Sequence, residues 1–109
     1  MRAAHLFLAQ RISAIILAPL VLVHLGLIVY AMRGGLSAAE ILARTQGSAL
    51  WAAFYGLFVV AAAVHAAIGV RTMIAESFGW RGRMLDGLTL AVGLGLFGLG
   101  ARAVAAVVL

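Results

Sequence analysis

Residues 12–31 read ISAIILAPLVLVHLGLIVYA, and this stretch contains no charged side chain. A helix needs about 20 apolar residues, each rising about 1.5 Å, to cross the hydrocarbon core of a bilayer. Residues 49–70 form a second uncharged stretch, and residues 87–109 form a third that only Arg102 interrupts. Because backbone polar groups in lipid must be bonded internally, the sequence predicts three membrane-spanning helices.

The composition also favours a membrane protein. Hydrophobic residues make up 66% of the 109 residues, and the mean hydropathy is +1.19. A soluble domain of this length could not hide so much apolar surface, because small folds leave a large share of their surface in water. We therefore predict an all-α integral membrane protein with one domain over residues 1–109. Its helices are expected at about 12–32, 49–74 and 86–108, as part of a helical bundle.

The charged residues exclude several function classes. Eight arginines, no lysine and only three acids give a net charge of +5. The arginines are dispersed and mostly flank the apolar stretches, which favours anionic lipid headgroups over nucleic acid as their counter-charges. The chain has no cysteine, which excludes disulfides, iron–sulfur ligation and thiolate chemistry within it. Any redox centre must therefore use histidine or belong to a partner subunit.

The placement of the arginines predicts an orientation in the membrane. Five are expected at the end that holds the N-terminus: Arg2, Arg11, Arg71, Arg81 and Arg83. The other end would hold Arg33 and Arg44, with Arg102 near it. By the positive-inside rule the N-terminus is cytoplasmic. Between the first two spans, Gly34 and Gly35 are expected to end a helix, and Ser37 and Glu40 have capping-box spacing, so a short surface helix should follow.

Two histidines lie inside the first two predicted spans. An ionisable side chain in lipid is energetically expensive, so we expect His24 and His65 to be functional; the alternative is a neutral histidine bonded to a neighbouring helix. His65 lies about 9 Å from the cytoplasmic end, counted from Arg71, and His24 about 20 Å from that end, counted from Arg11. A difference in depth of about 10 Å favours two haems, each with a second ligand from another chain.

Small residues lie around His65 and in the third predicted span. The face of the second span that carries His65 also carries small side chains, which would let a flat macrocycle approach the backbone: Ala61, Ala62, Gly69 and Thr72. Plain helix packing would use the same residue types. Residues 93–98 match G-x-G-x-x-G, but no strand precedes them, so close helix packing is predicted and dinucleotide binding is rejected.

Two segments resemble a known family. Residues 65–71, HAAIGVR, followed by Glu76, resemble the H-x-x-x-G-x-R-x-x-x-x-D/E motif of succinate dehydrogenase cytochrome b556 subunits. Residues 10–13, QRIS, resemble the H-R-x-S entry into the first helix of that family. Gln10 stands where the family usually has His, Phe7 where it often has Ser, and Glu76 where it has Asp. The order and spacing match over nearly the whole chain.

The resemblance implies a role for each matched residue. His65 would bind the iron of the haem b nearer the cytoplasm, and Arg71 would neutralise the charge of its propionates. Arg11 and Ser13 would lie near the quinone pocket and the propionates. No catalytic residue is implied in this chain.

His24 resembles the first-helix ligand of the family members that hold two haems. It would bind the iron of a second haem on the outer side of the membrane. Arg102 would lie near the propionates of that haem, or its side chain would instead reach the outer interface. Both interpretations of Arg102 stay open.

The implied function is electron transfer in a succinate dehydrogenase or fumarate reductase complex. A flavoprotein subunit and an iron–sulfur subunit would exchange electrons with ubiquinone or menaquinone, and this chain would be a non-flavin membrane anchor. Two haems b per complex would be shared with a second anchor chain or a second copy of this one. The resemblance implies a multi-pass protein of the bacterial inner membrane.

Three other classes stay open. A cytochrome b anchor of a different flavin dehydrogenase would use the same scaffold, since the substrate is chosen by other subunits. A small multidrug transporter has a similar length but needs a carboxylate within the membrane, and the three acids are expected in loops or at helix ends. An inert assembly subunit would hold no haem, and the combination of His65 with Arg71 argues against it.

Overall fold

The computed structural model describes residues 1–109 as four helices with no strand. The long helices are α1 (Ala3–Gly34), α3 (Ala49–Phe78) and α4 (Arg83–Val108), and the short α2 (Ala38–Thr45) follows α1. All three long helices have the length and apolar composition to cross a membrane. The prediction of an all-α fold with three spans is therefore confirmed.

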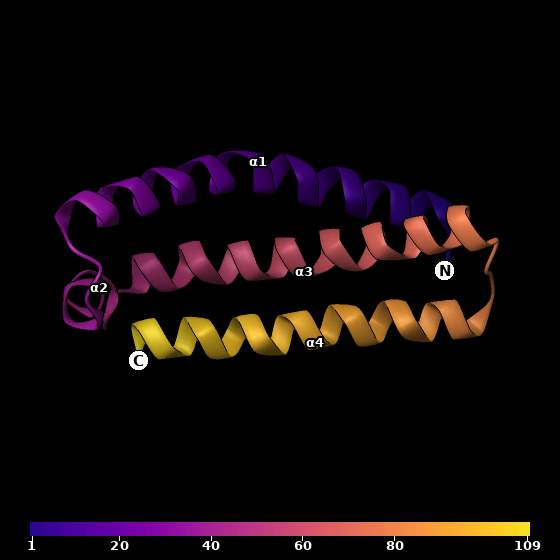
Figure 1. Cartoon of the computed structure of the whole chain (residues 1–109). Helices are drawn as coiled ribbons and strands as arrows, with labels where there is room; N and C mark the ends of the chain where they lie inside the picture. The colour runs from indigo at the N-terminus through magenta and orange to yellow at the C-terminus, as the bar shows by residue number, and fades with distance from the viewer.

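The long helices run side by side, and α3 packs against both α1 and α4 (Figure 1). The longest dimension is 48 Å, which matches a helix of about 32 residues at 1.5 Å per residue. The two termini lie at opposite ends, as three crossings require. Only nine of the 109 residues are buried. Most apolar side chains therefore face outward, where lipid or other subunits cover them.

The turn after α1 is built by glycine and a capping box. Gly35 caps α1 with a φ of 130°, a conformation that favours glycine. Ser37 Oγ accepts from the Glu40 amide at 3.2 Å, and Glu40 accepts from the Ser37 amide at 3.0 Å. The Ser37 hydroxyl and amide that donate to Glu40 hold the pKa of this carboxyl below its usual value. The predicted short helix and its capping box are therefore confirmed.

The last residue of α2 and the turn after it cap the end of α4. The last carbonyls of a helix have no partner within the helix. Here the Thr45 hydroxyl donates to the carbonyl of Val107 at 2.7 Å, and the Gly47 amide donates to that of Val108 at 2.8 Å. Hydrogen bonds between residues far apart in the sequence thus hold α2 and the turn after it against α4.

Two glycines of α4 lie against α3. A Cβ at Gly93 would lie 3.3 Å from the Cβ of Ala67, and a Cβ at Gly100 would overlap the Val59 side chain. A Cβ at Gly95 or at Gly98 would have no neighbouring atom within 4 Å. Close helix packing, which we predicted for residues 93–98, is therefore confirmed at Gly93 only, and the tightest contact lies further along at Gly100.

We expect Gly100→Ala to destabilise the protein by about 1–3 kcal/mol, the usual range for overpacking, because the new methyl group would push against Val59. Gly98→Ala is the matched control, since its methyl group meets open space and alanine favours the helix. Thermal unfolding of the purified protein in detergent measures both variants. Equal midpoints for the two would contradict the packing described here.

Candidate functional site

His65 is held between α3 and α1 by a buried serine. The hydroxyl oxygen of Ser13 lies 3.3 Å from His65 Nδ1, and the same hydroxyl donates to the backbone carbonyl of Gln10 at 2.9 Å. Only 4% of the Ser13 surface is exposed. The contact joins the two helices at the level of the histidine, so this imidazole faces the protein and not lipid alone.

A cavity of about 480 Å³ opens beside His65 along α1. Its lining combines the histidine with one cation, one amide and several apolar side chains: Phe7, Gln10, Arg11, Ala14, Ile15, Ala18 and His65. The small Ala14 and Ala18 leave the helix backbone accessible to a flat ligand. The sequence predicted small residues around His65 on its own helix, but this prediction did not include the small residues of α1.

Two polar groups of this cavity have no partner within the chain. Arg11 makes no ion pair, and its guanidinium lies 6.0 Å from the ring centre of Phe7. The side-chain oxygen of Gln10 is buried without a hydrogen-bond donor. A buried acceptor without a donor is energetically unfavourable. The Arg11 guanidinium is therefore available to a ligand in the cavity, whereas the Gln10 oxygen is covered by the protein.

Arg71 turns away from this cavity toward α4. Its guanidinium forms an ion pair with Asp86 at 2.5 Å and donates to the Thr89 hydroxyl at 3.3 Å. The N-terminal amine of Met1 also lies 3.5 Å from Asp86. Arg71 follows His65 by six residues, which places it about 240° further round the helix. This arginine thus joins α3 to α4, and it does not line the cavity beside His65.

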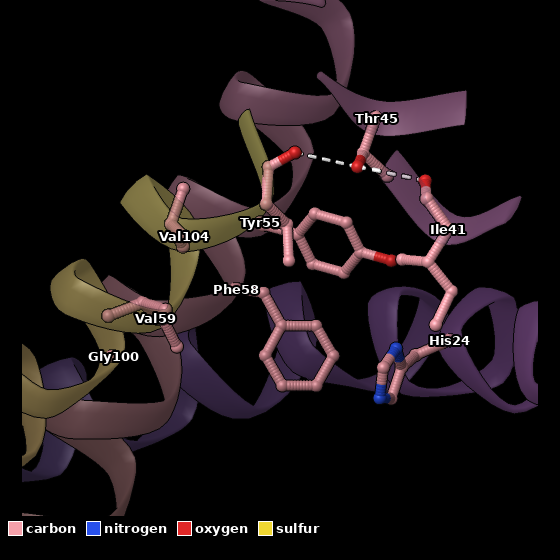
Figure 2. A pocket seen from close by; sticks show the side chains of 10 residues that line it. His24, Ile41, Thr45, Tyr55, Phe58, Val59, Gly100 and Val104 are labelled. Atoms are coloured by element: carbon pink, nitrogen blue, oxygen red, sulfur yellow. Dashed lines mark hydrogen bonds between the residues drawn. The ribbon is translucent and has the colours of Figure 1, made fainter. Parts of the chain in front are cut away.

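His24 lines a separate cavity of about 330 Å³ to which all four helices contribute. Figure 2 shows its imidazole across this cavity from the rings of Tyr55 and Phe58. The ring centres of His24 and Phe58 are 5.3 Å apart, and those of His24 and Tyr55 are 6.2 Å apart, both edge to face. His24 Nδ1 is buried and has no hydrogen-bond partner. This ring nitrogen therefore lacks a partner within the chain.

The two histidines lie at different depths, as predicted. Phe58, which contacts His24, precedes His65 by seven residues, and Ser13, which contacts His65, precedes His24 by eleven. At about 1.5 Å per residue the two imidazoles are about 10–16 Å apart along the bundle. Arg102 is exposed on α4 and does not line the His24 cavity. No group of three or more metal-ligating side chains is present, whereas a haem iron takes one such atom on each face.

These features define an integral membrane subunit of three spans, with His24 within the first span and His65 within the second. The chain belongs to the family of succinate dehydrogenase/fumarate reductase transmembrane subunits, whose model matches residues 2–108. Neither the comparison with curated proteins nor that with solved structures found a match. The chain is therefore a multi-pass membrane subunit of a family that works in complexes with other subunits.

Proposed function

We propose that this chain is the haem b-binding membrane anchor of a succinate:quinone oxidoreductase complex. The observation that carries the proposal is the position of His65 on a cavity that also holds the unpaired Arg11. When bound, haem b supplies one-electron transfer at a potential set by its axial ligands and burial. Its dehydrogenase partners would be a flavoprotein subunit and an iron–sulfur subunit.

The residues around His65 fit a haem. Ala14 and Ala18 leave room for a flat ring beside the imidazole, and the Arg11 guanidinium suits a propionate carboxylate. Phe7 and Ile15, at the rim of the cavity, are 63% and 66% exposed. A second anchor chain, or a second copy of this one, would cover this face and supply the opposite axial ligand.

The same end of the bundle suits a quinone. The Arg11 guanidinium would donate to a quinone carbonyl. The substrate would be ubiquinone or menaquinone. This end of the bundle also holds Arg2, Arg81 and Arg83, which supports a cytoplasmic N-terminus in a bacterial inner membrane.

The acids do not support a small multidrug transporter. Glu40 belongs to α2, Glu76 lies in the last turn of α3, and Asp86 lies in the first turn of α4, where Arg71 pairs with it. None of them stands in the middle of a span, where proton coupling would need a carboxylate.

A reduced-minus-oxidised visible spectrum of the purified complex, with haem counted per flavin, tests the proposal. We expect the absorption bands of a b-type cytochrome in a complex that oxidises succinate or reduces fumarate. A colourless complex with bound flavin would instead indicate an inert anchor. A b-type spectrum without either dicarboxylate activity would indicate the anchor of another flavin dehydrogenase.

We also propose a second haem b on the outer side, with His24 as one axial ligand. The position of His24 on a largely apolar cavity and its separate depth support this. We expect two haems per complex in the wild type and one in His24→Ala. His5→Ala is the matched control, because His5 is exposed in the first turn of α1. One haem per complex that His24→Ala leaves in place would contradict the second site.

A further inference from the structure

Ser13 has a single hydroxyl proton, and the structure indicates where it goes. The distance from Ser13 Oγ to the Gln10 carbonyl is 2.9 Å, within the usual range for a hydroxyl donor. The distance to His65 Nδ1 is 3.3 Å, slightly beyond the usual range for a nitrogen donor. Because the proton is given to Gln10, the serine oxygen can only accept from His65. This requires the proton of a neutral His65 to be on Nδ1.

The position of that proton decides which nitrogen can bind a metal. A neutral imidazole has one N–H and one lone pair, so a proton on Nδ1 leaves the lone pair on Nε2. Iron-binding histidines are commonly held in this way, with the second ring nitrogen donating to a protein oxygen that fixes the tautomer and the ring orientation. With the opposite tautomer, His65 would offer no lone pair at Nε2.

We propose that Ser13 is a positioning residue that holds His65 in the Nδ1–H tautomer and fixes the orientation of its ring. This inference rests on the proposed haem at His65 and gives Ser13 a role through the histidine, in place of the expected contact with quinone. Two observations separate the roles. Ser13 does not line the cavity that holds Arg11 and Gln10, and its hydroxyl proton is already donated within α1.

The first test needs no haem. The full chain is labelled with ¹⁵N-histidine, prepared without haem in detergent, and the ring nitrogen shifts of His65 are read by NMR at a pH where the ring is neutral. We expect one tautomer, Nδ1–H, in the wild type and a mixture in Ser13→Ala. Ser13→Thr keeps the hydroxyl and should restore the single tautomer. An unchanged Nδ1–H signal in Ser13→Ala would overturn the proposal.

The second test uses the complete complex. A hydrogen bond from Nδ1–H makes the histidine a stronger donor to iron, and losing such a bond commonly weakens metal binding by about 10- to 100-fold. We expect Ser13→Ala to shift the haem midpoint potential upward and weaken haem retention, with an unchanged KM for quinone. A raised quinone KM with an unchanged haem potential would overturn the proposal. A wild-type complex without haem would refute the proposed haem site, while the NMR result would still decide the role of Ser13.

Discussion

Complex purified from the His65→Ala variant should lack the haem nearer the N-terminal end, and the chain should still insert in the membrane. No other imidazole of this chain can replace His65. His24 lies about 10–16 Å further along the bundle, by helix rise, and His5 is exposed in the first turn of α1. The reduced-minus-oxidised spectrum, with haem counted per flavin, should show one haem fewer than the wild type.

The fold should survive this substitution. Without His65 the Ser13 hydroxyl still donates to the Gln10 carbonyl, so its only proton keeps a partner. The contacts of α3 with α4, including the ion pair of Arg71 with Asp86, do not involve the histidine. Membrane fractionation checks insertion, and His5→Ala provides the matched histidine control. An unchanged b-type spectrum and haem count in His65→Ala would refute the assignment of this ligand.

The local features of the fold could be predicted from the sequence. Hydropathy marks the three spans, and the capping box of Ser37 and Glu40 follows from spacing alone. The start of α1 at Ala3 was missed, because the apolar stretch begins after Arg11 whereas a helix can continue beyond the hydrocarbon core. The capping of α4 by Thr45 and Gly47 was also missed, since it joins residues that only the folded chain brings together.

The candidate site was predicted in part. The structure brings His65 and Arg11 to one cavity, as expected for neighbours of a shared site. Arg71 shares a sequence motif with His65 but lies on another face of α3, where it pairs with Asp86. Its expected role beside the haem propionates stays a prediction. Which side chain of α1 meets His65 depends on how the two helices are rotated about their axes. A single sequence does not predict this rotation, so the contact of Ser13 with His65 was found only in the structure.

The second large effect is expected on quinone activity, from a substitution in the cavity beside His65. We expect Arg11→Ala to lower succinate:quinone activity by about 10- to 100-fold, since a hydrogen bond from a charged donor contributes about 1.5–3 kcal/mol and 1.4 kcal/mol is tenfold. Succinate oxidation with an artificial dye as electron acceptor should stay near the wild-type rate, because the dye would accept electrons before they reach quinone. Both activities are measured on the same purified complex.

Two further variants separate a contact with quinone from a general loss of positive charge. Arg2→Ala removes an arginine from the same end of the bundle, outside the cavity, and should leave both activities unchanged. Arg11→Lys keeps the charge but loses the planar fork of donors, so its quinone activity should lie between those of the wild type and Arg11→Ala. Equal loss of dye and quinone activities in Arg11→Ala would indicate failed assembly. Full quinone activity in that variant would exclude Arg11 from the quinone site, because no other arginine of the chain lines this cavity.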